Sequence, residues 1–169
     1  MKAVRTLGLA VVMGAALTTA ALAKDLKMAY VDLSRLFDNY EKTKEYDAVL
    51  QKESEGYQKE REAMINKVRD AQSKLALLKE DQKQKMQVDI DKQKGELIEY
   101  DKKKREELAK KRDEKVREIL LEIEKVVSEL AQKEGYDFIL NDRVLIYGDQ
   151  SQNLTDRVLK AVNEAYRKK

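Results

Sequence analysis

The chain has 169 residues, of which 40% are charged and 6% are aromatic, and it contains no proline, cysteine, histidine or tryptophan. The absence of cysteine excludes disulfides, thiolate nucleophiles and thiolate zinc sites, and the absence of histidine excludes a Ser-His-Asp triad. High charge with few aromatic residues and no proline is typical of a long, solvated helical protein. We therefore expect no enzyme activity, no cofactor and no bound metal.

The first 23 residues have the three parts of a secretory signal peptide. Lys2 and Arg5 form a basic start, an uncharged and mostly apolar run spans 7–17, and Ala21-Leu22-Ala23 provides a small-x-small cleavage site. We expect cleavage before Lys24 and a mature protein outside the cytoplasm. The alternative is an uncleaved membrane anchor, but the apolar run is shorter than the ~20 residues that a bilayer span requires.

The remaining chain is almost neutral. The signal segment contributes two of the 35 basic residues and none of the 32 acidic ones. Positive and negative residues are mixed along the chain, whereas a nucleic-acid-binding protein concentrates basic residues on one surface. We expect no nucleic-acid partner.

A short strand is predicted at 27–32, and a long, charged helical stretch follows from Ser34 to Lys133. Steps of four and three residues through its first half meet mostly apolar or tyrosine side chains, which indicates a coiled-coil seam. Polar residues interrupt this seam and weaken it. The seam positions are Leu36, Tyr40, Thr43, Asp47, Leu50, Ser54, Tyr57, Arg61, Met64, Val68, Ala71, Leu75 and Leu78.

The apolar spacing changes after Leu78. The segment 79–85, KEDQKQK, is entirely polar, and eleven-residue steps then run from Leu97 to Leu130. Such steps have a period near 3.67, which favours a straighter helix path. We predict an antiparallel helical hairpin with its turn near 79–85. One continuous helix is the alternative, because no proline or glycine marks the turn.

The end of the chain predicts two strands and a helix. Gly135 fits a helix C-cap, and strands are expected at 136–140 and 144–147, joined as a hairpin by a turn at 141–143. Asn153 is expected to cap the last helix. The apolar face of that helix comprises Leu154, Val158, Ala161, Val162 and Ala165.

The expected fold class is α+β, mostly α: a long antiparallel helical hairpin, or coiled-coil arm, projecting from a small β body shared between subunits. The arm comprises 34–133, and the body comprises 24–33 and 134–169. The strands are apolar on both faces, and this chain can cover only one of them, so we expect a homo-oligomer. The expected association residues are Met28, Tyr30, Val31, Phe138, Ile139, Leu140, Val144, Leu145, Ile146 and Val158.

Segments at the two ends carry a resemblance to a known family. They are MAYVDLSRLFDNY at 28–40, EGYDFILN at 134–141, VLIYGD at 144–149 and NLTDRVLKAVN at 153–163. With a signal peptide in front and a lysine- and glutamate-rich hairpin between them, the mature chain resembles the Skp/OmpH family of periplasmic chaperones. The family commonly has aspartate where Asn153 stands here, and either residue can cap a helix.

The resemblance implies a jellyfish-shaped homotrimer in the periplasm, with a barrel body and three helical hairpins around a cavity. The cavity would hold unfolded outer membrane proteins and prevent their aggregation. That compartment has no ATP and the sequence has no phosphate-binding loop, so an energy-independent holdase is expected. The alternative is a structural coiled-coil protein of the cell envelope, which would share the arm without needing the strand motifs at both ends.

Two sets of arm residues are candidates for client contact or for motion. Met64, Met86 and Ile90 offer adaptable apolar contacts for a client, or they are ordinary seam residues. Gly56 and Gly95 lie within predicted helices, where each costs ~1 kcal/mol relative to alanine. They are either flexing points or tolerated defects.

A basic stretch from Lys102 to Arg117 is the third candidate feature of the arm. It offers contacts to acidic client groups, or to the phosphates of lipopolysaccharide or anionic lipid. The alternative is a solvated helix face. The residues expected to make the lipid contact are Lys102, Lys103, Lys104, Arg105, Lys110, Lys111 and Arg112.

Overall fold

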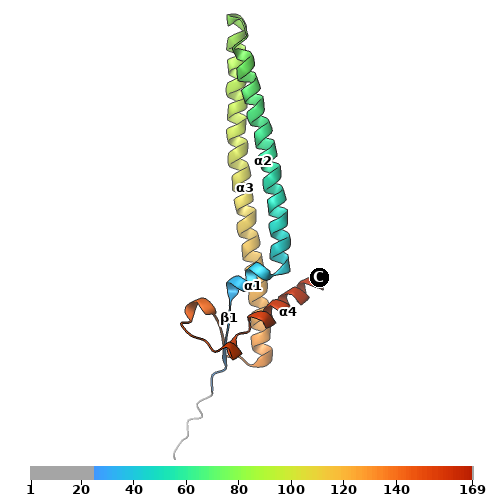
Figure 1. The fold of residues 1–169 in the computed structure, drawn as a ribbon, viewed down its shortest axis with the longest axis vertical. Helices are drawn as coiled ribbons and strands as arrows, with labels where there is room; N and C mark the ends of the chain where they lie inside the picture. Colours follow the sequence, from blue (N-terminus) through green and yellow to red (C-terminus); the bar gives the residue numbers. More distant parts are fainter. Residues whose placement is uncertain (1–24, 169) are drawn as a thin grey trace, which may run out of the picture.

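A computed structural model describes residues 25–168 of the chain, so the predicted signal peptide and its cleavage site lie outside the described residues. The molecule consists of a long two-helix arm that stands on a small body (Figure 1). Within the described range, no helix combines the length and the apolar character that crossing a membrane requires.

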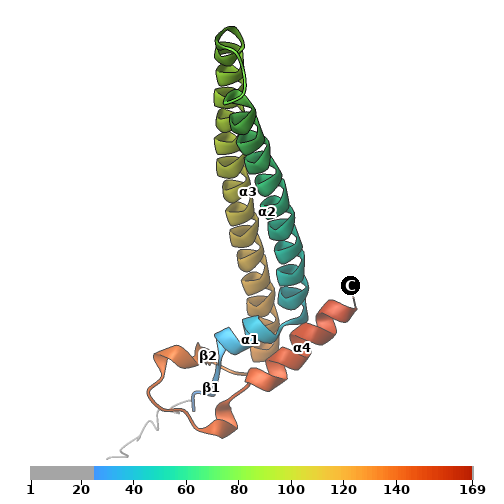
Figure 2. The ribbon, with the colours of Figure 1, turned by 45° about the horizontal axis from the view of Figure 1, so that its top comes forward.

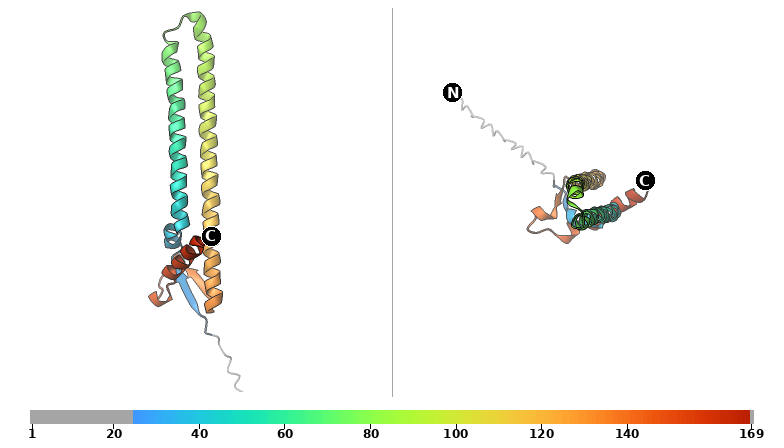
Figure 3. Two further views of the ribbon diagram at one scale, coloured as in Figure 1. Left: turned by 90° about the vertical axis from the view of Figure 1, so that its right-hand side faces the viewer. Right: turned by 90° about the horizontal axis from the view of Figure 1, so that it is seen from above.

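The arm is formed by α2 (Glu41–Leu75) and α3 (Glu80–Glu134), which run antiparallel side by side (Figure 3). At 1.5 Å per residue, the 35 residues of α2 extend for roughly 50 Å. The 55 residues of α3 continue past the base of α2 into the body. The predicted mostly helical α+β fold with a long helical hairpin is thus confirmed.

The turn of the arm occupies 76–79, which is earlier than the predicted position at 79–85. Residues 80–85 belong to the first turns of α3, where Glu80 and Asp81 favourably meet the positive end of the helix dipole. The polar segment therefore starts the second helix instead of interrupting it. The alternative of one continuous helix is wrong.

The base of the arm contains a break within the stretch predicted as a single helix from Ser34. A short helix, α1 (Leu33–Asn39), ends at Tyr40, whose backbone is extended with ψ of 128°. Tyr40 is buried, and its hydroxyl donates a 2.8 Å hydrogen bond to Glu122 of α3. Burial of this ring fixes the point at which the chain turns from the body into the arm.

The sheet differs from the predicted hairpin. Strand β1 (Met28–Val31) pairs in parallel with β2 (Phe138–Asn141), and the segment 144–147 is not a strand. The side chain of Asn141 accepts a hydrogen bond from the Arg143 amide, and the short helix η1 (Asp142–Val144) follows. This local turn directs the chain away from β2, so the predicted second strand at 144–147 is wrong for the single chain.

The core of the body lies where α4 (Thr155–Arg167) crosses the lower part of α3 (Figure 2). Before α4 the chain passes through a second short helix, η2 (Gln150–Gln152). Gly135 ends α3 with a left-handed φ of 71°, as its predicted C-cap role requires. The buried core residues are Ala29, Val31, Leu36, Tyr40, Ile119, Ile123, Leu154, Val158 and Val162.

Candidate functional site

The sheet of the body has one covered face and one exposed face. The strand register places Met28 beside Phe138 and Ala29 beside Ile139, so alternate pairs point to opposite faces. Ala29 and Ile139 pack into the core, whereas Met28 and Phe138 are 48% and 51% exposed. An exposed apolar sheet face of this kind marks an interaction surface.

The apolar surface continues on both sides of the two strands. Leu26 lies just before β1, and Val144, Ile146 and Tyr147 follow β2; all four side chains are more than half exposed. Ile146 is fully exposed, although isoleucine is among the residue types that are most often buried. We call the following set the apolar body surface: Leu26, Met28, Phe138, Leu140, Val144, Ile146 and Tyr147.

Strand β2 also has an open edge. Its neighbour β1 pairs with it on one side, and β1 makes a further bridge through Tyr30 to Asn153 on the other side. Among residues 25–168, no strand pairs with the outer edge of β2. An open edge beside exposed apolar side chains favours pairing with a strand from another chain.

Tyr30 shows how the loop after β2 shapes this surface. Its ring lies on the outer face of the sheet but is buried, and its hydroxyl donates a 3.4 Å hydrogen bond to the Gly148 carbonyl. A Cβ at Gly148 would lie 2.7 Å from the Tyr30 ring, so only glycine permits this approach. The loop that carries Ile146 and Tyr147 is thereby held against β1.

The structure divides the predicted association residues into two groups. Tyr30, Val31 and Val158 are buried within the chain itself, and Ile139 and Leu145 are partly buried. The other five, Met28, Phe138, Leu140, Val144 and Ile146, are exposed on the body. The sequence does not separate these groups, because both consist of apolar residues in or near strands. Leu26 and Tyr147 join the exposed group although the sequence pattern does not select them.

The seam of the arm contains the residues considered for client contact. Ile90 is buried between the helices, with 1% of its surface exposed, and Met64 and Met86 are half-buried. Tyr57 and Val68, two seam positions, are also buried. Ile90 therefore packs between the two helices of the arm and is not exposed to a client.

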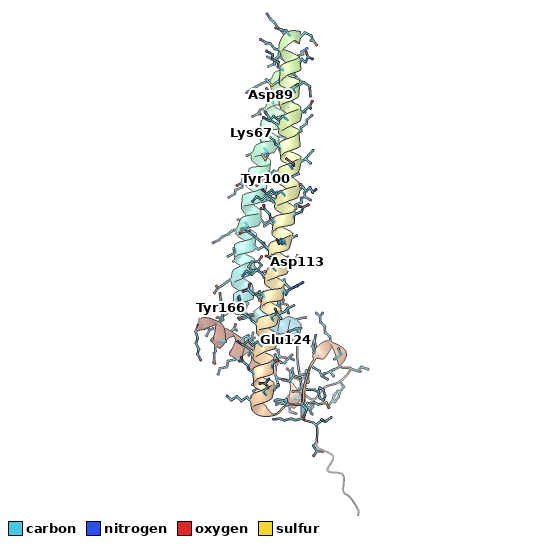
Figure 4. The ribbon with its side chains drawn as sticks, turned by 180° about the vertical axis from the view of Figure 1, so that it is seen from behind. Lys67, Asp89, Tyr100, Asp113, Glu124 and Tyr166 are labelled. Carbon is cyan, nitrogen blue, oxygen red and sulfur yellow. The ribbon has the colours of Figure 1, made fainter. Side chains whose placement is uncertain are left out.

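A polar cluster joins the helices midway along the arm. Asp101 of α3 accepts a short hydrogen bond from the Tyr57 hydroxyl and a 2.8 Å bond from Arg61 Nε, and Arg105 Nε lies 3.0 Å from its second oxygen. Tyr100, labelled in Figure 4, stacks against Tyr57 with ring centroids 6.1 Å apart. Arg61 interrupts the predicted seam, and this cluster explains why a charge is tolerated there.

The charged cluster lowers the pKa of the Asp101 carboxyl below the ordinary aspartate value of 3.8. The largest cause is the hydrogen bond from Tyr57, followed by the hydrogen bond from Arg61 and the positive charge of Arg105. A carboxyl with a lowered pKa stabilises the fold above its unfolded-state pKa, and this contribution is lost as the pH falls through the folded value. Asp101 therefore ties α2 to α3 while it is ionised.

We expect Asp101→Asn to lower the thermal unfolding midpoint at neutral pH, and the deficit relative to the wild type to shrink below pH 3.8. Circular dichroism melts of both proteins, from neutral to strongly acidic pH, measure this difference. The comparison cancels the titration of other carboxyls, which both proteins share. A deficit that stays constant at acidic pH would contradict the role given to the ionised carboxylate.

The basic stretch of α3 is largely paired within the chain. Lys104 and Lys110 bond to glutamates on α3, Lys111 binds Glu53 of α2 at 2.8 Å, and Arg105 binds Asp101. Among the described ion pairs, none involves the remaining three members of the set, Lys102, Lys103 and Arg112. The positive charges of these three side chains are not neutralised by a described ion pair, so they are the ones that an anionic partner would meet.

Two further features of the described residues concern motion and metal binding. A Cβ added at Gly56 or Gly95 would meet nothing within 4 Å, so neither glycine is required by close packing. Their role as flexing points stays a prediction. Within residues 25–168, no three His, Cys, Asp or Glu side chains gather to hold a metal ion.

Comparisons with known proteins agree on one family. The model of the OmpH-like outer membrane protein family matches residues 27–162. A chaperone protein Skp of Vibrio cholerae is 27% identical over 165 residues, covering 93% of this chain and 95% of that protein. A chaperone protein Skp of Yersinia enterocolitica is 28% identical over 160 residues, covering 89% and 94%.

A solved structure shares the fold. The crystal structure of an OmpH-like protein from Caulobacter crescentus superposes with a TM-score of 0.77 at 11% sequence identity. The match covers 83% of this chain and 85% of that one. The likeness therefore includes both the arm and the body.

Proposed function

This chain belongs to the OmpH-like outer membrane protein family, and on that premise we propose that it is an ATP-independent periplasmic holdase for unfolded outer membrane β-barrel proteins. The observation that carries the proposal is the arm: two antiparallel helices of 35 and 55 residues that project from the body (Figure 1). Relatives named chaperone protein Skp extend over nearly the whole chain, which supports the same class of function.

The proposed working form is a homotrimer whose shared body is built on the apolar body surface. The open edge of β2 and the exposed side chains of Phe138 and Ile146 support association through the body. Arms attached to such a body would surround a common space. The number three follows from the family resemblance, whereas the exposed surface argues for association itself.

Client contact is proposed to be weak and distributed. Several apolar residues of the arm are exposed and separated by charged residues, among them Val49, Leu77, Val88 and Ile98. Together with the half-buried Met64 and Met86, they would offer many low-affinity contacts at high effective concentration, which retains a client without trapping it. Anionic lipid or lipopolysaccharide is a second proposed partner, through Lys102, Lys103 and Arg112.

We expect the mature chain to suppress aggregation of a urea-unfolded outer membrane β-barrel protein when the mixture is diluted without ATP. The physical reason is that an enclosed client cannot meet a second unfolded chain. Turbidity measures the effect, with serum albumin at equal concentration as the control, and added ATP should change nothing. A folded, oligomeric protein that gives no protection would contradict the holdase and favour a structural coiled coil of the envelope.

A further inference from the structure

The C-terminal helix α4 supports the base of the arm. Its first half is anchored in the body, where Val158 and Val162 are buried and the Thr155 hydroxyl accepts a 2.9 Å hydrogen bond from the Asp32 amide. Its last turn reaches out of the body to the start of α2, as Figure 4 shows for Tyr166. The helix therefore connects the body to the arm at a second place, separate from α3.

The start of α2 lacks a helix cap of its own. The residue in the capping position is Tyr40, whose side chain makes no capping hydrogen bond. The Asn163 side chain of α4 instead accepts a 2.9 Å hydrogen bond from the Glu41 amide. Asparagine oxygen is among the preferred acceptors for the first amides of a helix. Here that acceptor is supplied by a helix more than 120 residues away in the sequence.

Two more side chains of α4 hold the same turn of α2. Arg167 binds the Glu41 carboxylate with Nε at 2.8 Å and with its terminal Nη2, and the Tyr166 hydroxyl donates a 2.7 Å hydrogen bond to Glu45. The Tyr166 ring also meets the Tyr40 ring edge to face, with centroids 5.8 Å apart. Positions 163, 166 and 167 share one face of α4, so a single helical turn makes all these contacts.

The junction that this turn holds is a natural hinge. Tyr40 is one extended residue between two helices, and residues at helix ends absorb most hinge motion in proteins. α1 is fixed in the body by the buried Leu36, and α3 passes through the same core. Because α3 runs from this core into the arm as one helix, and Lys42 of α2 pairs with Glu118 and Glu122 of α3, the inclination of the arm depends on these contacts together with what α4 adds at the first turn of α2.

We propose that α4 is a brace that sets the inclination of the arm to the body through Asn163, Tyr166 and Arg167. Release of the brace loosens the first turns of α2 and widens the range of inclinations that the arm takes, while α3 keeps the arm attached to the core. If the arm changes its inclination to fit clients of different size, that role rests on the proposed function. The brace itself lies within one chain and is tested without a client.

The test compares Asn163→Ala/Arg167→Ala with Lys168→Ala, which removes the same charge at the end of the same helix and leaves the three contacts intact. Amide hydrogen exchange is measured in α2 residues 42–50 and in α3 residues 119–134. In the double variant we expect about fivefold faster exchange at 42–50, the effect of losing one helix cap, and unchanged exchange at 119–134. Lys168→Ala should match the wild type.

Arm inclination is measured by spin labels on Ser151→Cys in η2, which lies in the body away from the Tyr40 junction, and on Lys67→Cys in α2; both positions are exposed. The chain has no cysteine, so the labels are specific, and excess unlabelled chain dilutes distances between subunits. The double variant should give a broader distance distribution with a shifted mean. An unchanged distribution, with or without faster exchange at 42–50, would overturn the brace.

If exchange also rises at 119–134, the body itself is disturbed, and Asn163→Ala alone becomes the deciding variant. A broader distance distribution in that variant, with unchanged exchange at 119–134, supports the brace. A distance distribution equal to that of the wild type overturns it. Failure of the aggregation assay has no effect on these readouts, so the brace and the holdase can fail separately.

Discussion

Val158→Asp is expected to unfold the body of the protein. Val158 has no exposed surface, and it lies in α4 against the buried Ile119 and Ile123 of α3. Loss of the buried valine removes about 1.5–3 kcal/mol, and an unpaired buried carboxylate adds to this cost. We expect a total above about 4 kcal/mol, a large part of the ~5–15 kcal/mol that holds a typical domain together.

Urea unfolding followed by circular dichroism and hydrogen exchange at 119–134 measures this effect, and sedimentation is expected to show loss of the proposed oligomer. Ala165→Asp is the matched control, since it introduces the same charge on an exposed position of the same helix. That control should cost only about 1 kcal/mol, from the lower helix propensity of aspartate and its place near the C-terminal end of the helix. A Val158→Asp protein that keeps its unfolding midpoint and still sediments as a folded oligomer would contradict the docking of α4.

Phe138→Glu combined with Ile146→Glu is expected to abolish association while each chain stays folded. Ile146 is fully exposed and Phe138 is 51% exposed in the single chain, so the substitutions remove little internal packing. If both side chains are buried between subunits, the lost apolar contacts are worth about 3–6 kcal/mol in total. That range corresponds to roughly 100-fold to 10⁴-fold weaker association, before the added charges are considered.

Sedimentation velocity distinguishes the outcomes, and the unfolding midpoint at low protein concentration verifies the fold. Leu77→Glu is the control, because Leu77 is 87% exposed but lies in the turn at the far end of the arm. The control should sediment as the wild type does. An oligomer that survives the double substitution would show that the chains associate through a different surface.

The long helices are readable from the sequence because their signals are local and repeated. Predicted seam positions such as Tyr57 and Val68 are buried, and Gly135 caps α3 as its place in the pattern indicates. The turn at 76–79 is harder to locate, since no glycine or proline marks it. Acidic residues in the first turn favour the start of α3 at Glu80. They belong to the same polar segment that the sequence pattern assigns to the turn, so the pattern alone does not separate the turn from the helix start.

The arrangement of the body depends on contacts between distant segments, which periodicity does not reveal. The parallel pairing of β1 with β2 joins residues 110 positions apart, and the capping of α2 by Asn163 joins residues 122 apart. The apolar run at 144–147 has the composition of a strand, but the turn after Asn141 leads it away from β2 in the single chain. The break at Tyr40 has no local signal, because tyrosine also fits the helical seam.

The candidate site was partly accessible from the sequence. The prediction that one sheet face lacks cover within the chain selects Met28, Phe138 and Leu140, whose side chains are exposed. It does not exclude Val31 and Val158, which fill the chain's own core. Alternation along a strand separates two faces, but the identity of the covered face depends on where α3 and α4 lie.

The mass of the complex formed with one unfolded client distinguishes a trimeric holdase from the other possible assemblies. A urea-unfolded outer membrane β-barrel protein is diluted into an excess of the mature chain without ATP, and light scattering weighs the complex after gel filtration. We expect a complex of one client with three chains. A client bound to a single chain would contradict the trimeric holdase. A folded oligomer that forms no complex with the client would also contradict it.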